Sequence, residues 1–281
     1  MKHIFLNLKR FDVPVEYGGV NRIAPIQEWG AYIVRNTQEA LRLYNPEEVE
    51  FVQYFPEAHL IGAAAAKSSG SPVQVGCQGV YRMSTAIGGN FGAFSTNRPA
   101  SAMKALGVSS VIIGHCEERT DKLGIMMEAG VTDTAAVNRV LNQEIRQAVD
   151  CGMSVLYCIG EDTGEMDCWK EVLEEQLEVG LSGVDRSRIT IGYEPIWSIG
   201  PGKKPADKPY ITKVARFIKE KTGGMPVVYG GGLRKDNAEM LATIPEIDGG
   251  LIALTRFQGK VGFYPDEYID IIHTYLGGEK Q

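Results

Sequence analysis

Side chains able to move a proton or hold an anion follow several short apolar segments of this 281-residue chain. Lys9 follows an apolar run near the start, His115 closes the run that begins at Val111, and Glu194 closes the run that begins at Ile189. A carboxylate can take a proton from carbon, an imidazole can donate a hydrogen bond to an oxygen, and a lysine supplies a fixed positive charge. If the fold brings the three together, they form an acid-base site for a small anionic molecule.

Charge and cysteine usage limit the classes of partner. The formal net charge is −6 and Lys and Arg form no cluster, which argues against a nucleic-acid surface. Polar residues interrupt the first segment where a signal peptide needs an apolar stretch, and the longest later apolar run, 60–66, is too short to span a bilayer. The five cysteines are an odd number without a CxxC pair, so neither disulfides nor a zinc site are indicated. We expect a cytoplasmic protein with no membrane or nucleic-acid partner and no metal.

Short β-branched segments alternate with stretches of helical spacing from one end of the chain to the other. The expected strands are 3–9, 49–55, 72–78, 111–115, 154–160, 189–195, 226–232 and 249–254. The expected helices are 27–44, 57–67, 99–106, 134–151, 166–181, 207–222, 235–244 and 265–276. Eight such units in about 250 residues match the size of a closed (β/α)8 barrel, so we predict one α/β domain over residues 1–281. A doubly wound open sheet is the alternative, but no GxGxxG follows the first strand.

Chemically capable residues cluster where this barrel places its active site, at the carboxyl ends of the strands. In chain order they are Asn7 and Lys9, Gln78, His115, Glu161, Glu194, and the triple glycine 230–232.

Four motifs in this order resemble those of the triosephosphate isomerase family. They are Asn7-Leu8-Lys9 for N-x-K, residues 113–119 (IGHCEER) for IGHSERR, residues 193–203 (YEPIWSIGPGK) for YEPxWxIGTGK, and residues 229–232 (YGGG) for YGGS. The resemblance covers essentially the whole chain. It implies an intramolecular oxidoreductase that interconverts dihydroxyacetone phosphate and glyceraldehyde 3-phosphate in glycolysis and gluconeogenesis, without metal or organic cofactor.

The resemblance also implies roles for individual residues. Glu194 is expected to be the catalytic base, His115 a neutral electrophile and Lys9 the fixed charge, with Asn7 a neutral donor beside it. Residues 195–205 are expected to form a closing lid that contains Gly200. For Glu117 and Arg119 we expect a structural role in a buried ion pair.

The phosphate site departs most from the family pattern. Gly232 stands where the family has a serine, and Ala253 and Leu254 stand where it has two glycines. Together with Asn7, Lys9 and Gly200, these three are the expected substrate-binding residues. Arg256 follows closely and is either a compensating cation for the phosphate or a solvated side chain.

Three functions therefore stay open. The first is triose phosphate isomerisation, the second is an isomerase or epimerase of a tetrulose phosphate, and the third is a non-catalytic barrel that binds a sugar phosphate. The resemblance further implies a homodimer, although Cys116 and Glu118 replace a serine and an arginine in a segment tied to subunit contacts.

Overall fold

A computed structural model describes residues 1–200 and 203–277 of the chain, and in it strands and helices alternate. Eight strands lie in these residues: β1 Lys2–Asn7, β2 Val49–Phe55, β3 Val73–Cys77, β4 Ser110–Ile113, β5 Ser154–Ile159, β6 Ile189–Tyr193, β7 Val227–Tyr229 and β8 Gly249–Ile252. Every expected strand is present, and most end earlier than the apolar pattern predicted. The residues after each strand therefore belong to loops, where functional side chains are usually found.

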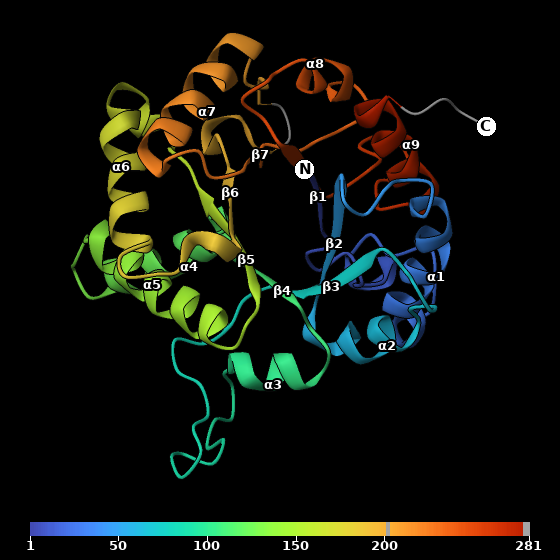
Figure 1. The fold of residues 1–281 in the computed structure, drawn as a ribbon, viewed down its shortest axis with the longest axis horizontal. Coiled ribbons are helices and arrows are strands. Elements are labelled where there is room, and N and C mark those ends of the chain that lie inside the picture. The colour runs from blue at the N-terminus through green and yellow to red at the C-terminus, as the bar shows by residue number, and fades with distance from the viewer. Residues whose placement is uncertain (201–202, 278–281) are drawn as a thin grey trace.

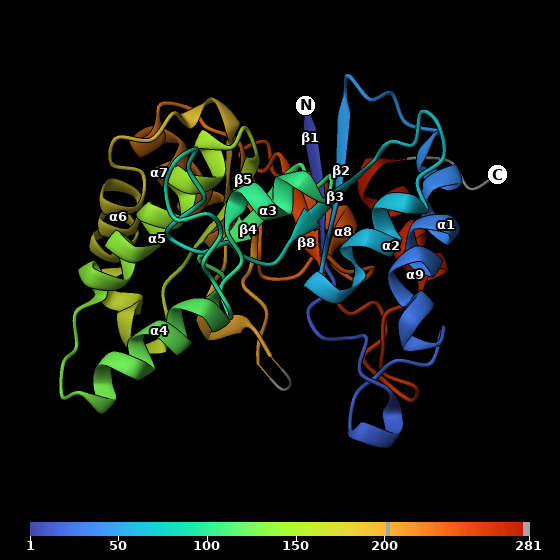
Figure 2. The same ribbon diagram turned by 90° about the horizontal axis from the view of Figure 1, so that it is seen from below.

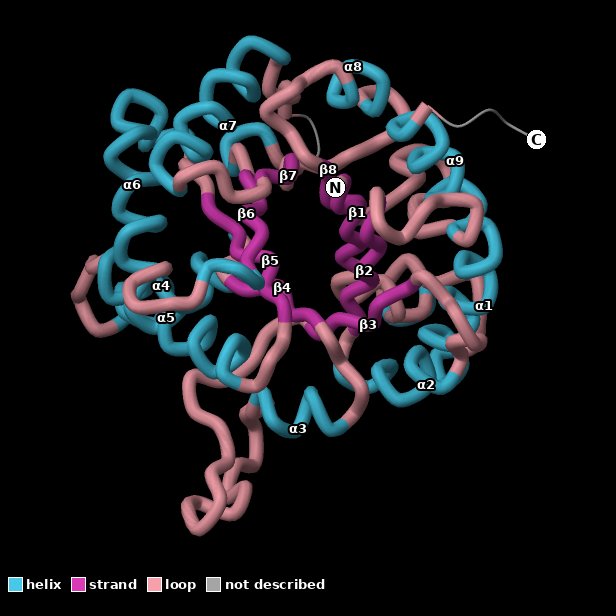
Figure 3. The backbone as a smooth tube through the Cα atoms, in the orientation of Figure 1, coloured by secondary structure: helices cyan, strands magenta, loops and turns pink. Residues whose placement is uncertain are grey.

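The strands form a closed barrel in the order β1 to β8. All neighbouring strands run parallel, and β8 closes the ring by pairing with β1, with His3 opposite Gly249. Figure 3 shows this ring of strands surrounded by helices. The predicted (β/α)8 barrel is thus confirmed.

Nine α-helices surround the barrel in the described residues (Figure 1). They are α1 Trp29–Leu41, α2 Leu60–Ala65, α3 Ala100–Ala105, α4 Cys116–Glu128, α5 Thr134–Asp150, α6 Trp169–Gly180, α7 Lys208–Thr222, α8 Ala238–Ala242 and α9 Pro265–Leu276. Single 3-10 turns lie at Val15–Tyr17, Ile26–Glu28, Glu57–His59, Arg186–Arg188 and Ile196–Ser198, and a longer one at Thr163–Cys168. In the residues that the structure describes, no helix combines the length and apolar character needed to cross a membrane.

Helix α4 was not predicted. None of its residues is buried, so it lacks the apolar stripe from which an amphipathic helix is recognised. Two exposed apolar residues on it, Ile125 and Met127, are 67% and 57% exposed. Figure 2 shows α4 projecting away from the other helices, and its first turn lies next to the predicted site.

Two apolar layers hold the barrel together. One layer lies between the strands and the surrounding helices. The other fills the barrel interior, and along each strand its side chains alternate with those of the outer layer. The interior cluster contains Phe5, Val52, Tyr54, Ile112, Leu156, Cys158, Val228 and Leu251. Because side chains fill the interior, a substrate has to bind at one end of the barrel.

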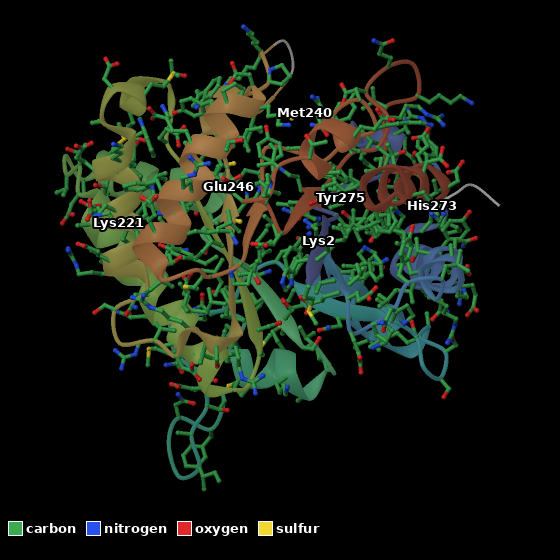
Figure 4. The ribbon with its side chains drawn as sticks, turned by 45° about the horizontal axis from the view of Figure 1, so that its top comes forward. Lys2, Lys221, Met240, Glu246, His273 and Tyr275 are labelled. Carbon is green, nitrogen blue, oxygen red and sulfur yellow. The ribbon has the colours of Figure 1, made fainter. Side chains whose placement is uncertain are left out.

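The amino-terminal end of the barrel is occupied by structural contacts. Lys2 begins β1, and its ammonium group donates to the carbonyl of Ile247 at 2.9 Å and lies 5.7 Å from the ring centroid of Tyr275 on α9. Figure 4 labels Lys2 and Tyr275, which lie near each other where β1 starts. The polar residues predicted to act in chemistry lie beyond the opposite ends of the strands.

Candidate active site

Glu194 directly follows β6, and its side chain is buried. Its backbone N–H donates to the carbonyl of Ile159 at 2.8 Å, so the loop after β6 continues beside the end of β5. Gly160 makes this approach possible, since a Cβ atom there would lie 1.7 Å from the carbonyl oxygen of Glu194. The backbone of Glu194 is therefore fixed by two neighbouring strands.

The two carboxylate oxygens of Glu194 have different surroundings. Oε2 accepts a hydrogen bond of 2.8 Å from the backbone N–H of Cys116, at the start of α4. Oε1 lies 3.2 Å from Nε2 of His115, but the two are not aligned for a hydrogen bond, and Oε1 has no other partner among the residues that the structure describes. Burial raises the pKa of Glu194, and the nearby His115 and the Cys116 N–H oppose this shift. A buried carboxylate with one unpaired oxygen suits a general base.

His115 caps the amino terminus of α4 with its ring. Nδ1 accepts a hydrogen bond of 3.3 Å from the backbone N–H of Glu117, and a nitrogen that accepts from N–H carries no proton. This hydrogen-bond network assigns the ring proton to Nε2, the nitrogen on the side of Glu194. A neutral imidazole in this tautomer can donate a hydrogen bond to a substrate oxygen.

Lys9 is held in an uncommon backbone conformation, with a φ of 40°. A non-glycine residue costs about 1–3 kcal/mol in such a region, which the surrounding contacts have to offset. Its N–H donates to Oδ1 of Asn7 at 3.0 Å, and its ammonium group donates to Oε1 of Glu117 at 2.6 Å. The side chain of Lys9 is thus directed across the barrel end toward the first turn of α4.

A cavity of about 410 Å³ lies beside these groups. Gln78 links its walls, because Nε2 donates to the carbonyl of Lys9 at 3.0 Å and to Oδ1 of Asn7 at 3.3 Å. The other lining residues come from the loops after β1 and β4, from β4 itself and from the first turn of α4: Arg10, Phe11, His115, Ile112, Glu117 and Glu118. Gln78 was noted at its strand end but was not among the predicted site residues, and its position after a buried strand was the only sequence signal.

The remaining predicted substrate-binding residues follow β6, β7 and β8. Gly232 has a φ of 98°, and its carbonyl accepts from Nδ2 of Asn237 at 2.9 Å. Ala253 and Leu254 are half-buried directly after β8, and Gly200 is exposed. The structure places all of them at the same end of the barrel as Glu194. Among the described residues, no side chain accepts a hydrogen bond from the backbone N–H of Gly200, Gly232, Ala253 or Leu254.

The predicted lid begins beside a buried carboxylate that sequence reasoning left out of the site. Oε1 of Glu161 accepts from the hydroxyl groups of Tyr193 and Tyr210, at 2.9 and 3.0 Å, and from Nε1 of Trp197 at 2.8 Å. Its backbone carbonyl accepts from Ile196 at 3.0 Å. Glu161 thus anchors the first turn of the lid. Pro201 and Gly202 of the predicted lid lie outside the described residues.

One structural expectation is corrected. Glu117 and Arg119 do not form a buried ion pair, because the side chain of Glu117 is 67% exposed and pairs with Lys9. Arg119 instead donates to the carbonyls of Gly114 and Cys158.

The guanidinium group of Arg256 is already engaged. Nε donates to Oε1 of Glu267 at 2.8 Å, and the group lies 4.0 Å from the ring centroid of Tyr264. Of the two alternatives for Arg256, a compensating cation loses support because its charge is already paired, and a solvated side chain agrees with an exposure of 38%.

The chain forms a (β/α)8 barrel. At the carboxyl ends of its strands it holds a buried carboxylate, a neutral imidazole and a lysine. These features define its class as a (β/α)8 barrel protein with an acid-base site. The family described as triosephosphate isomerase matches residues 30–273. The chain belongs to the triosephosphate isomerase family, which confirms the resemblance found in the four motifs.

Individual relatives agree with this assignment. The chain is 32% identical over 218 residues to the triosephosphate isomerase of Acaryochloris marina, covering 76% of this chain and 82% of that protein. It is 35% identical over 174 residues to that of Geobacter metallireducens, where the match spans 57% of this chain and 64% of the relative. The crystal structure of triosephosphate isomerase from Bartonella henselae superposes with a TM-score of 0.71 at 22% identity, covering 98% of this chain and 99% of that one. This last likeness supports the fold.

Proposed function

We propose that this protein interconverts dihydroxyacetone phosphate and glyceraldehyde 3-phosphate by proton transfer between adjacent carbons. One observation carries the proposal: the buried carboxylate of Glu194 lies 3.2 Å from the nitrogen of His115 that bears the ring proton. At this separation, the base can act on one substrate carbon while the electrophile acts on the oxygen bonded to the adjacent carbon. Family membership supports the same reaction.

In the proposed reaction, Glu194 takes a proton from the carbon next to the substrate carbonyl, and an enediolate forms. His115 donates a hydrogen bond from Nε2 to the oxygen on which negative charge develops, and the ammonium group of Lys9 stabilises that charge. Glu194 then returns the proton to the neighbouring carbon, so the substrate is isomerised without gaining or losing atoms. The raised pKa of Glu194 makes its carboxylate a stronger base than an exposed one.

The substrate phosphate would bind at the loops after β6, β7 and β8. We propose that backbone N–H groups of Gly200, Gly232, Ala253 and Leu254 face it, with Asn7 and Lys9 on the opposite side of the site. Support comes from the shared end of the barrel, and from the hydrogen bond of 2.9 Å between the N–H of Leu233 and the carbonyl of Leu251, which joins the loops after β7 and β8. Closing of residues 195–205 over the phosphate would exclude water.

The test is turnover of glyceraldehyde 3-phosphate by the wild type and by Glu194→Gln, which keeps the size of the side chain and removes its basicity. Loss of a positioned general base costs about 100- to 10,000-fold, so kcat should fall by at least that factor. Glu165→Gln is the matched control, because Glu165 lies in an exposed turn and makes a capping contact with Asp162. Equal rates for the wild type and Glu194→Gln would refute the proposed role of Glu194.

A tetrulose phosphate is the second candidate substrate. The feature that favours it is Leu254, which stands with Ala253 where the family has two glycines. A cavity of about 410 Å³ at the same end of the barrel, partly lined by Arg10 and Phe11, offers further space. Turnover of tetrulose phosphates with little triose turnover would favour it. A protein that binds sugar phosphates tightly without turning either over would be a binding barrel.

We also propose a single-domain homodimer located in the cytoplasm. The loop between β3 and α3, which projects from the barrel in Figures 1 and 3, supports dimerisation because Ile87 and Phe91 are fully or almost fully exposed on it. Five free cysteines are consistent with a reducing compartment. Sedimentation of the wild type against Phe91→Asp tests the dimer: the variant should sediment as a monomer, and an unchanged dimer would place the interface elsewhere.

A further inference from the structure

Three side chains at the site offer three different kinds of metal ligand. A ring nitrogen of His115, the sulfur of Cys116 and a carboxylate oxygen of Glu194 lie within 4.8 Å of one another. Within residues 1–200 and 203–277, this is the one group of three or more histidine, cysteine and acidic residues with such spacing. We propose that these side chains bind a divalent cation of the zinc class, and that the bound ion reversibly blocks the acid-base site.

The spacing is close to that of ligands on one tetrahedral zinc ion. Zinc binds nitrogen at about 2.0 Å and thiolate sulfur at about 2.3 Å, so two such ligands lie about 3.5 Å apart in a tetrahedral site. Sγ of Cys116 lies 3.7 Å from Nδ1 of His115, and Oε1 of Glu194 lies 3.2 Å from Nε2. In the tautomer assigned above, Nδ1 of His115 carries the free electron pair and lies on the side of Cys116, so it binds the ion in place of its hydrogen bond from Glu117. Glu194, which lies beside Nε2, has to reach the ion by a rotation about side-chain bonds.

Glu194 provides an independent indication of a ligand. The residue is 1% exposed, and its Oε1 atom accepts no hydrogen bond in the described residues. A buried carboxylate oxygen without a partner is costly, and a bound cation would satisfy it. Repulsion between the cation and the ammonium group of Lys9 would be reduced, because this ammonium group pairs with Glu117 at 2.6 Å.

Cys116 makes this site selective for soft cations. Thiolate and imidazole ligands favour zinc and its congeners over magnesium and calcium, which prefer oxygen. When the ion binds, the thiol loses its proton to solvent and the sulfur forms the metal bond, with no change of oxidation state.

Metal binding itself does not depend on the proposed function. Only the predicted effect of the metal on activity rests on it. An ion bound by Glu194 and His115 would occupy the base and the electrophile, so inhibition should be competitive with the sugar phosphate and reversible by a chelator. Binding of the ion can be measured separately from turnover.

The experiment uses cobalt(II) as a spectroscopic probe and zinc(II) as the inhibitor, with the metal-free full chain. The wild type should bind one cobalt ion, with a thiolate-to-metal charge-transfer band and the visible bands of a tetrahedral site. Cys116→Ser should lose the charge-transfer band, and its zinc inhibition constant should rise by at least about 10- to 100-fold. Cys168→Ser is the matched control, because Cys168 is an exposed free thiol elsewhere, and it should behave like the wild type.

The outcomes separate the two proposals. A wild-type cobalt complex without a thiolate band, or equal zinc inhibition of the wild type and Cys116→Ser, would overturn the metal site. A protein that gives the cobalt spectrum but turns over no sugar phosphate would leave the metal site standing and refute the proposed function. Zinc inhibition is expressed relative to the metal-free rate of each variant, so a lower basal rate in Cys116→Ser does not affect the comparison.

Discussion

The carboxylate of Glu194 accepts a hydrogen bond from the backbone N–H of Cys116 at 2.8 Å. This contact joins the residue after β6 to the first turn of α4, which is separated from the end of β4 by two residues. The amino terminus of a helix carries unpaired N–H groups and a partial positive charge, which favours the ionised carboxylate. Burial acts in the opposite direction, and the balance leaves the pKa of Glu194 raised. The same helix start positions the ring of His115.

The length of the Glu194 side chain should matter as much as its charge. Glu194→Asp keeps a carboxylate but withdraws it by about one carbon–carbon bond from both Cys116 and the substrate. A displacement of about 1 Å can cost 100-fold in rate, so we expect kcat to fall by roughly that factor with a small change in KM. Steady-state kinetics with glyceraldehyde 3-phosphate provide the measurement. A variant as active as the wild type would show that the carboxylate does not act on the substrate directly.

The raised pKa of Glu194 predicts the acid limb of the pH profile. The base works only when ionised, and the fraction that is protonated grows as the pH falls through the pKa. Because burial raises this pKa, kcat/KM should begin to fall at a pH above the ordinary glutamate value of about 4.5. The substrate phosphate itself titrates near pH 6. Comparing the pH profiles of the wild type and Glu194→Asp separates the two titrations. An acid limb caused by residue 194 should shift in the variant, whereas a limb caused by the substrate phosphate should not.

Glu161 should stabilise both the fold and the lid. In Glu161→Ala, the donors of Tyr193, Trp197 and Tyr210 lose their common acceptor. Each unsatisfied buried donor costs about 1–3 kcal/mol, so we expect a loss of at least about 2 kcal/mol in the free energy of unfolding, together with a lower kcat. Glu161→Gln retains an accepting oxygen and should lose clearly less. Denaturant unfolding of both variants provides the test, and equal losses would mean that the negative charge of Glu161, and not merely an accepting oxygen, is needed to hold the three donors.

The sequence predicted the barrel and the catalytic candidates because both leave local signals. Alternating apolar segments specify the strands, and Lys9, His115 and Glu194 stand at strand ends inside motifs. Helix α4 left no such signal, since it buries no residue and its position depends on contacts of its first turn. The three donors around Glu161 and the pairing of Arg256 with Glu267 were likewise not predictable, because they join residues from different strands, helices and loops whose side-chain directions depend on the complete fold.

Leu254 offers the sharpest test of the phosphate site. A side chain directly after β8 can keep a phosphate oxygen from the backbone N–H groups, and glycine removes that obstacle. In the double variant Ala253→Gly, Leu254→Gly we expect KM for glyceraldehyde 3-phosphate to fall by about 10-fold, the equivalent of one added hydrogen bond to a charged group at about 1.4 kcal/mol. Two new glycines should also cost about 1–2 kcal/mol of stability.

The control for this variant is Leu43→Gly, which makes the same change from leucine to glycine away from the site. Leu43 is 64% exposed in the loop after α1. The control variant should leave KM unchanged. If the double variant is folded and active but its KM for triose phosphate is the same or higher, then Ala253 and Leu254 do not obstruct the phosphate. A simultaneous rise in KM for tetrulose phosphates would instead show that Leu254 contributes to binding of the longer substrate, since an apolar side chain can bury part of the additional carbon.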